Sequence, residues 1–398
     1  MINKLSNSIN YLILVLFFLL PFSNAFSSIL LYITIALNFI NLFLKKEKIN
    51  LSYPIYIYLG LLIYATINYS LQGSFSDNNK FWRFLPILSL GFLGFTSINK
   101  ISFIKIQKTS IISCLVFLTF ITVKTIIFYC NNHYLPFGNG EQVNAILIIH
   151  RPYLGFYILL NIILSFDLFI NKKKIFYLFI TILFALSLLL ILARLSIVSL
   201  VIIAVIYAIF YAKINYKIKL VSLLLILGSL GLVLKLNPNT KERFNTESYE
   251  KFVDYEPRFV IWKSVYNIAN QPNFNQFIGL GNNETVENLL VDNYTKEISN
   301  TNKRAYFISE RFNTHSQYLD FYLMGGIPYL LLFISFLVSL IIYFRKNYLS
   351  TLITISFILF FFVENVFARQ LGCLLFTLYI GLCIIKSKEF RAPLVHKN

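Results

Sequence analysis

The side chains of this sequence that could bind an anion or move a proton are mainly arginines and histidines. Arg194 lies inside the apolar run Leu-Leu-Ile-Leu-Ala-Arg-Leu-Ser-Ile, His150 directly precedes Arg151, and His315 opens another apolar block in Thr-His-Ser-Gln-Tyr-Leu-Asp. A guanidinium group binds carboxylate or phosphate oxygens bidentately, and an imidazole exchanges a proton near neutral pH. The sequence has no paired-carboxylate motif, no His/Cys set at metal-ligand spacing and no phosphate-binding lysine loop. Chemistry in this chain would therefore depend on arginines and a histidine.

Each of these residues also has a structural explanation. Arg194 either extends its side chain to the membrane surface or binds an anion in an outward cavity, and its sequence context leaves both open. A lone histidine at a helix end, such as His315, is usually structural. Pro152 suits the first turn of a helix, so His150 and Arg151 fit a positioning role as well as a chemical one.

The elements that must position these residues are membrane-spanning helices. Of the 398 residues, 57% are hydrophobic and only 13% are charged, whereas soluble domains carry about 25% charged residues. The apolar residues come in blocks of roughly 20, the length that crosses a bilayer, and only a helix satisfies such a backbone in lipid. We therefore predict an all-α integral membrane protein with about twelve spans, near residues 9–24, 27–44, 52–70, 82–98, 109–129, 152–171, 175–192, 195–212, 219–235, 315–344, 348–363 and 367–385.

The basic residues determine the expected topology. They gather in alternate gaps between the apolar blocks, and these gaps contain Lys45, Lys46, Lys48, Lys100, Lys105, Lys108, Lys172, Lys173, Lys174, Lys213, Lys217, Lys219, Arg345 and Lys346. All of them fall on one side of the membrane if both termini are cytoplasmic. This pattern explains the net charge of +18 without nucleic-acid binding. Residues 1–25 resemble a secretory signal, but we favour an uncleaved first span, and cleavage would leave the remaining topology unchanged.

The chain divides into three parts at one long hydrophilic segment. Residues 1–235 form spans 1–9, residues 236–314 form a large loop on the non-cytoplasmic side, and residues 315–398 form spans 10–12 with a cytoplasmic tail. A helix is predicted inside the loop. It begins near Pro257 and has an apolar stripe that includes Ile261 and Val265. An apolar stripe beside a bilayer predicts a helix that lies against the membrane or caps the bundle.

Arginines and a histidine on the outward side suit a reaction on a pre-activated donor. Displacement of a lipid diphosphate requires cations that neutralise a polyanion and a base that accepts the proton of an acceptor hydroxyl. The acidic residues within the spans are Asp167, Asp320 and Glu364, and none is near the middle of its span. A proton- or ion-coupled transporter is expected to have one there.

Several short motifs, in order along nearly the whole chain, resemble the O-antigen ligase / O-antigen polymerase family of bacterial envelope glycosyltransferases. They are His150-Arg151-Pro152-Tyr153, Arg194 at a short turn, Arg258 and Trp262 on the loop helix, Gly279-Leu280-Gly281, His315 before span 10, Gly325-Gly326, Glu364-Asn365 and Arg369-Gln370-Leu371-Gly372. Two positions depart from the family pattern: Ala193 replaces a usual Ser, and Ser316 stands where Asn often follows the histidine. Neither departure removes a charged group.

The resemblance implies a role for each site residue. Arg194 and Arg258 would bind the diphosphate of a glycan linked to undecaprenyl diphosphate, and His315 would act as general base or orient the acceptor hydroxyl. Supporting residues would be Trp262, His150, Arg151, Glu364 and Arg369. The sugar would transfer with inversion, without a cofactor or a metal, at the periplasmic face of the bacterial inner membrane.

The leading hypothesis is an O-antigen ligase that transfers a whole glycan to lipid A–core. An O-antigen polymerase would transfer it to another carrier-linked repeat, and a third kind of relative uses protein hydroxyls. The alternatives from other classes are a polysaccharide transporter or flippase and a non-enzymatic scaffold. The sequence shows no inverted repeat, which disfavours a transporter. A scaffold would leave Arg194, Arg258 and His315 without a common purpose.

Overall fold

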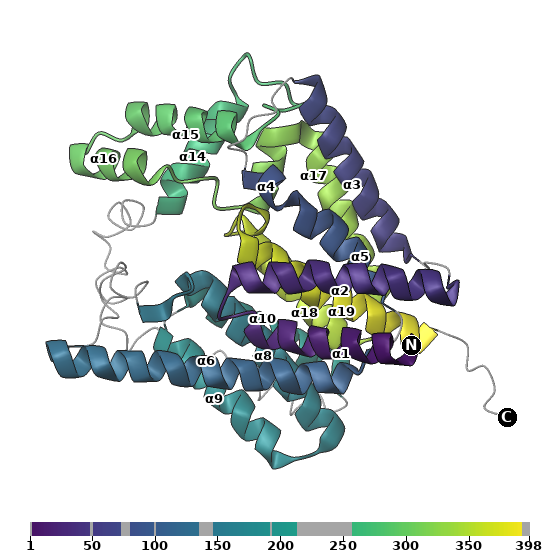
Figure 1. The fold of residues 1–398 in the computed structure, drawn as a ribbon. Helices are drawn as coiled ribbons and strands as arrows, with labels where there is room; N and C mark the ends of the chain where they lie inside the picture. Colours follow the sequence, from purple (N-terminus) through teal and green to yellow (C-terminus); the bar gives the residue numbers. More distant parts are fainter. Residues whose placement is uncertain are drawn as a thin grey trace.

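The computed structural model describes residues 2–47, 51–72, 80–98, 101–134, 146–191, 193–212 and 257–391 (Figure 1). Within these ranges all regular structure is helical. The helices of the first half are α1 (Ile2–Leu19), α2 (Asn24–Lys45), α3 (Tyr53–Leu71), α4 (Lys80–Pro86), η1 (Ile87–Gly91), α5 (Phe92–Thr96), α6 (Phe103–Asn132), α8 (Arg151–Lys172), α9 (Ile175–Ile191), α10 (Arg194–Ile206) and η3 (Tyr207–Tyr211). Those of the second half are α14 (Pro257–Ala269), α15 (Asn283–Glu297), α16 (Thr301–Glu310), α17 (Gln317–Phe344), α18 (Tyr348–Phe361), η4 (Val366–Ala368) and α19 (Gln370–Arg391).

The protein is an all-α multi-pass membrane protein, as predicted. Seven helices of the described ranges are long and apolar enough to cross a bilayer, and four shorter apolar helices accompany them. The span predicted at 82–98 is formed by α4, η1 and α5 in succession, because the helix changes to π-helical hydrogen bonding directly after Pro86. The span predicted at 219–235 lies outside the described residues.

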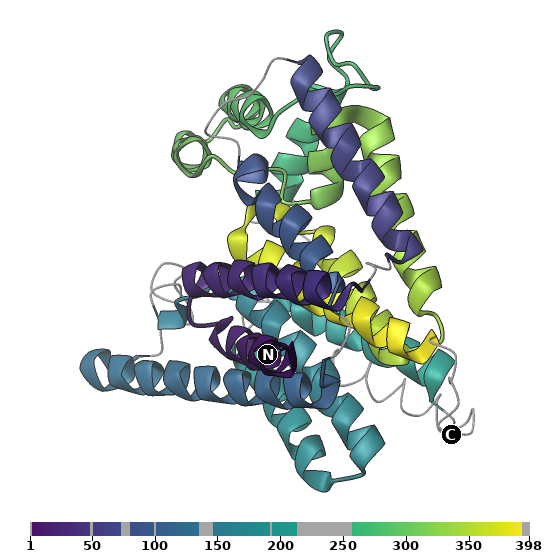
Figure 2. The same cartoon turned by 45° about the vertical axis from the view of Figure 1, so that its right-hand side comes forward.

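The centre of the bundle is formed by α8 and α19. Most side chains of both helices are buried, and Figures 1 and 2 show them surrounded by other helices. Polar groups at this depth are hydrogen-bonded to each other: the Ser110 hydroxyl on α6 lies 2.8 Å from Asn161 Oδ1 on α8 and 2.7 Å from the Tyr379 hydroxyl on α19. These bonds satisfy groups that have no water to bind in a membrane interior.

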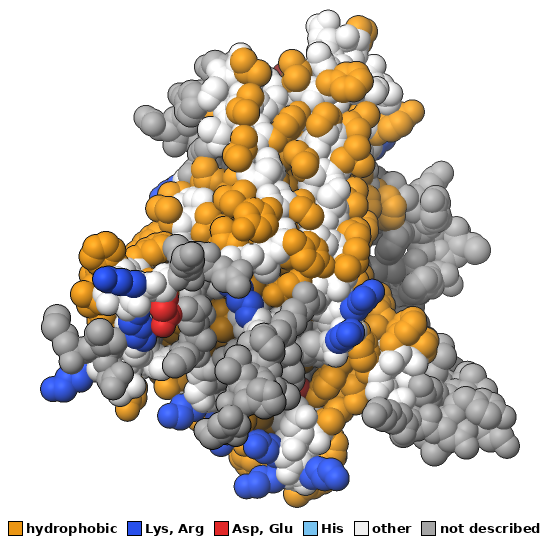
Figure 3. Space-filling view, turned by 90° about the vertical axis from the view of Figure 1, so that its right-hand side faces the viewer, with side chains coloured by type: hydrophobic (Ala, Val, Ile, Leu, Met, Phe, Trp, Pro, Cys, Tyr) orange, Lys and Arg blue, Asp and Glu red, His pale blue; other side chains and the backbone are white. Residues whose placement is uncertain are grey.

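The outer surface of the bundle is apolar where α3 and α17 pack side by side. Their exposed side chains include Ile63, Ile67, Leu331 and Val338. Figure 3 shows hydrophobic side chains spread over this face, with Lys and Arg side chains gathered toward its lower end. An apolar belt of this kind is suited to contact with lipid tails.

Helix α17 is broken near its middle, and the break receives the segment that follows α14. Pro328 has no N–H to give to the Met324 carbonyl, and the Ile327 N–H donates to the Gln276 carbonyl instead of Leu323. The amides of Leu280 and Gly281 replace these donors, at 2.8 Å from the carbonyl oxygens of Leu323 and Met324 respectively. The loop therefore completes the hydrogen bonding of α17.

The helices α14, α15 and α16 form a group beside the beginning of α17 (Figures 1 and 2). The predicted apolar stripe of α14 is buried, with Ile261, Val265 and Ile268 at most 3% exposed. It packs in protein contacts with α15 and α17. This group holds Arg258 over the end of the bundle from which α17 starts.

Candidate functional site

His315 lies on the short segment that joins α16 to α17. Its backbone has φ +46°, in the left-handed region, and its amide N–H donates to Asn313 Oδ1 at 3.1 Å. The imidazole packs near the Phe312 ring, with centroids 5.6 Å apart. Its Nδ1 atom is buried and has no hydrogen-bond partner within the described ranges. The local backbone thus fixes the imidazole while leaving one ring nitrogen without a protein partner.

Three hydrogen bonds brace the residue before His315. The Trp262 indole N–H donates to the Thr314 carbonyl at 3.2 Å. The Thr314 hydroxyl and the Asn365 side-chain amide bond each other, at 2.9 Å and 3.0 Å. Thr314 and Asn365 are buried, so α14, the His315 segment and the turn after α18 are joined at one point.

Arg258 and Glu364 form an ion pair beside this brace. Arg258 Nη2 lies 3.6 Å from Glu364 Oε1, and the side chain of Glu364 is 7% exposed. Burial raises the pKa of Glu364 to about 7, although the charges of Arg258 and Arg369 act in the opposite direction. The desolvation of a carboxylate on this scale outweighs its attraction to two nearby cations.

Burial and the positive charge around His315 keep its imidazole neutral. Burial, and then the charges of Arg258, Arg369 and His150, lower the pKa of His315 to about 3. Burial, Arg369 and Arg151 also lower the pKa of His150. A neutral imidazole retains a lone pair to which a proton can be transferred.

A cavity of about 370 Å³ opens next to this cluster, between α4, the start of α8 and the start of α19. His150, Tyr153, Arg369 and the exposed Arg83 line it. The Tyr153 hydroxyl donates to the Asn365 carbonyl at 3.4 Å, which connects the cavity wall to the brace at Thr314. The cavity thus has cationic and histidine side chains on walls that adjoin His315.

The other two predicted arginines stand at the edge of the cluster. Arg151 begins α8 and Arg194 begins α10, and their charges act on one another. The helix ends come close because Gly155 has no side chain: a Cβ there would meet Ala193 Cβ and Ser196. Arg194 is therefore linked to the cluster through Arg151, while Arg258, Glu364, Arg369, His150 and His315 are brought together directly by their contacts and charges.

The sequence analysis gave no role to three buried residues of the site. Thr314 and Asn365 form the brace, and the Gln317 side-chain carbonyl accepts a 2.9 Å hydrogen bond from the Phe367 amide. Thr314 is next to His315 and Gln317 lies two residues after it, while Asn365 is part of the Glu364-Asn365 motif.

No group of three or more His, Cys, Asp or Glu side chains that could hold a metal ion occurs in the described ranges. A ligand at this site would meet the positive charge of four arginines beside the neutral imidazole of His315. These arginines are Arg258, Arg369, Arg83 and Arg151. Such a set binds a polyanion and accepts a proton.

Fold and site together define a multi-pass membrane protein with a cationic, histidine-containing site at one end of its helix bundle. Residues 179–334 match the family model of the O-antigen ligase domain. The matched stretch, less than half of the chain, contains Arg194, Arg258, Trp262 and His315. Residues 179–334 therefore support the O-antigen ligase/polymerase family that the sequence motifs predicted, and members of that family are glycosyltransferase-like ligases and polymerases. Comparison with curated proteins gives no match.

Proposed function

We propose that this protein is a glycosyltransferase of the O-antigen ligase type. It moves a glycan from undecaprenyl diphosphate to lipid A–core at the periplasmic face of the bacterial inner membrane, with both termini in the cytoplasm. The observation that carries the proposal is the convergence of Arg258, Arg369 and His150 on the neutral His315. This cluster is assembled from an extramembrane helix and three separate parts of the bundle.

In the proposed reaction the acceptor hydroxyl oxygen attacks the anomeric carbon of the carrier-linked sugar. The bond from that carbon to the diphosphate oxygen breaks, and the electron pair leaves with undecaprenyl diphosphate. Arg258 and Arg369 offset the negative charge of the leaving group, and Arg194 with Arg151 extends the cationic surface. The acceptor proton passes to His315. Attack opposite the leaving group inverts the anomeric centre.

Binding of the donor would itself prepare His315 to accept this proton. Burial and the surrounding cations hold the pKa of His315 at about 3, too low for an effective base at pH 7. A bound diphosphate would cancel part of the positive charge that adds to the effect of burial, so the pKa would rise from that value in the direction of the usual value of about 6.5. The base would thus become stronger only when the donor is in place.

The proposal is tested first by His315→Ala in full-length protein supplied with a lipid-diphosphate-linked glycan and lipid A–core. Glycan transfer should be abolished while the protein still accumulates in the membrane. The matched control is His133→Ala, because His133 also has a left-handed backbone, with φ +58°. It should retain transfer. Transfer that survives His315→Ala would remove the catalytic assignment.

A deletion strain identifies the acceptor by one lipopolysaccharide gel. Loss of a ligase leaves bare core and accumulated carrier-linked polymer. Core that carries a single repeat would instead identify the protein as an O-antigen polymerase.

A further inference from the structure

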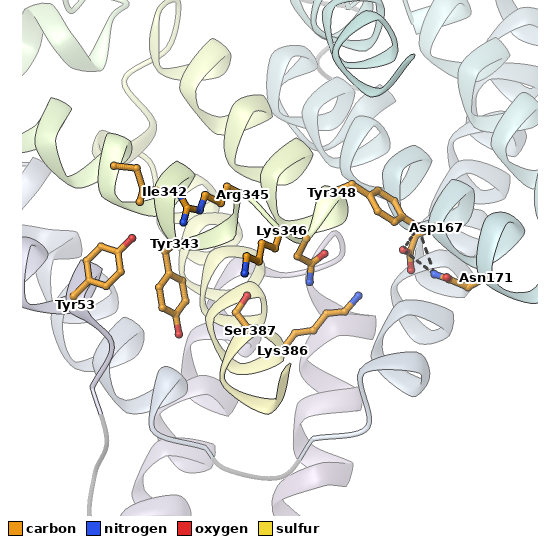
Figure 4. A pocket seen from close by; sticks show the side chains of 11 residues that line it. Tyr53, Asp167, Asn171, Ile342, Tyr343, Arg345, Lys346, Tyr348, Lys386 and Ser387 are labelled. Carbon is orange, nitrogen blue, oxygen red and sulfur yellow. Dashed lines mark hydrogen bonds between the residues drawn. The ribbon is translucent and has the colours of Figure 1, made fainter. Parts of the chain in front are cut away.

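A second cavity, of about 720 Å³, lies at the opposite end of the bundle from His315 (Figure 4). The same helices build both places. α17 starts beside His315 and ends at Phe344, and α18 runs back from Tyr348 toward Glu364. α19 starts after Arg369 and reaches the cavity with Lys386 and Ser387. The cavity is therefore separate from the candidate active site.

Three cations and one acid line this cavity. The cations are Arg345, Lys346 and Lys386, and the acid is Asp167. Figure 4 shows the three basic side chains along one part of the wall and Asp167 with Asn171 and Tyr348 on another. The lining thus carries a clear excess of positive charge.

Asp167 offsets only one of the three positive charges, and its carboxylate is held by hydrogen bonds within the protein. Its Oδ2 accepts from Gln107 Nε2 at 2.6 Å, and its Oδ1 accepts from the Tyr348 hydroxyl at 2.6 Å and from Asn171 at 3.0 Å. Within the described part of the chain, no carboxylate lies within ion-pair distance of Arg345 or Lys346. The cavity therefore has positive charge to offer an anion from outside the chain.

A buried hydroxyl points to the same kind of ligand. Ser387 is 5% exposed, and its Oγ has no hydrogen-bond partner among the residues that the structure describes. Figure 4 shows it close to Lys346, with the Lys386 side chain extending from the same helix toward Asp167. A buried hydroxyl without a partner costs free energy that a bound acceptor would recover. A phosphate oxygen held by Lys346 would be such an acceptor.

Positive-inside topology accounts for basic residues at this end of the bundle. It does not account for their convergence on one cavity or for the unsatisfied hydroxyl of Ser387. The rim also includes Ile342, which is 51% exposed on the apolar face of α17. A ligand with a charged head and apolar tails would fit this combination, and basic pockets between spanning helices bind anionic headgroups in this way.

We propose that this cavity binds a phosphate group, and that the phosphate belongs to the headgroup of an anionic phospholipid. The acyl chains would lie along the exposed apolar side of α17. The proposal is independent of the glycan transfer proposed above, because none of the residues involved lies at the His315 site.

The test compares phosphatidylglycerol, phosphatidylcholine and inorganic phosphate as probes of the purified full-length protein. The variant is Arg345→Gln with Lys346→Gln, since neither side chain belongs to the Asp167 network. The matched control is Lys172→Gln with Lys174→Gln, which removes the same charge from the exposed turn between α8 and α9. Retained lipid is counted by native mass spectrometry, and Tm is measured with each probe.

Wild type and the control should retain phosphatidylglycerol, and the variant should bind it on the order of tenfold more weakly, because each nearby cation contributes to headgroup binding. Ser387→Ala, which keeps every charge, should also weaken retention. Phosphatidylcholine should be retained to the same small extent by all four proteins. Equal retention of phosphatidylglycerol by both double variants would overturn the proposal. A Tm rise with inorganic phosphate alone, lost in the Arg345/Lys346 variant, would overturn the assignment to a lipid.

Discussion

The indole N–H of Trp262 donates a 3.2 Å hydrogen bond to the carbonyl of Thr314, the residue directly before His315. This bond connects the helix that carries Arg258 to the backbone that carries the imidazole. Since Thr314 also bonds Asn365, beside Glu364, one brace sets the positions of a cation, a carboxyl and a histidine. Site geometry in this protein is therefore maintained from outside the spanning helices.

Trp262→Phe should reduce glycan transfer by roughly tenfold while leaving the protein folded in the membrane. Phenylalanine keeps most of the packing but cannot donate to Thr314, so α14 loses its tie to the His315 segment. A displacement of this kind is costly for a reaction that depends on alignment. The measurement is the initial rate of transfer in purified full-length protein.

Tyr266→Phe provides the control, because Tyr266 lies on the same helix and is 69% exposed. It should keep the wild-type rate. If the two variants are equally active, the Trp262–Thr314 bond has no part in positioning the site.

Arg258→Lys should lose most of the transfer activity although it preserves the charge. An ammonium group cannot reproduce the planar guanidinium fork that binds phosphate oxygens bidentately. Rates and KM for the lipid-linked donor are the quantities to measure, and KM should rise.

The opposite exchange on the same helix, Lys263→Arg, is a suitable control. Lys263 forms a 2.7 Å ion pair with Glu297, and its side chain is 66% exposed. Such a surface pair contributes little, so activity should be unchanged. Full activity of Arg258→Lys would show that the site does not use a bidentate contact there.

Glu364 should make the protein less stable as the pH rises. Its pKa is about 7 in the folded protein and near the ordinary value of about 4.3 after unfolding. Between these values the folded state binds more protons than the unfolded state. The free energy of unfolding therefore falls as pH rises, by up to about 4 kcal/mol for this group.

The comparison is between wild type and Glu364→Gln, with Tm measured in detergent at pH 5 and pH 8. Between pH 5 and pH 8 the Tm of the wild type should fall by more than the Tm of the variant. Below pH 6.5 the lowered pKa of His315 has the opposite effect, because it raises the free energy of unfolding as the pH rises. His315 is present in both proteins, so this contribution cancels in the comparison. Glu310→Gln, at an exposed position on α16, should behave as wild type. An identical pH response in wild type and Glu364→Gln would mean that Glu364 titrates as an exposed carboxyl.

The sequence predicted the spanning helices well because block length and hydrophobicity determine them directly. Span 315–344 corresponds to α17 (Gln317–Phe344) and span 348–363 to α18 (Tyr348–Phe361). Charged residues could also be selected from the sequence, since their cost in a membrane requires an explanation. These properties are local and need no knowledge of the fold.

The remaining features depend on the proximity of groups far apart in the chain, which leaves no pattern in the sequence. The bond between Thr314 and Asn365 joins two uncharged side chains far apart in the chain. The break in α17 could be suspected from Gly325-Gly326 and Pro328, but not its filling by the amides of Leu280 and Gly281. The sequence also did not show that Arg345 and Lys346 line one cavity, because positive-inside topology already explained both residues.

Gly326→Ala should detach the loop from α17 and abolish glycan transfer. Gly326 has φ +70° and ψ −166°, a conformation that costs an L-residue about 1–3 kcal/mol. A Cβ at this position would also collide with the backbone of Gln276 and Phe277, so the loop could not stay hydrogen-bonded to the break.

Gly60→Ala on α3 is the matched control, since a Cβ there meets nothing within 4 Å. Limited proteolysis should cut the Gly326 variant faster near residues 275–281 than the Gly60 variant, and transfer should be lost only in the former. A Gly326 variant that resists proteolysis and keeps its activity would mean that the loop is held by α15 and α14 alone.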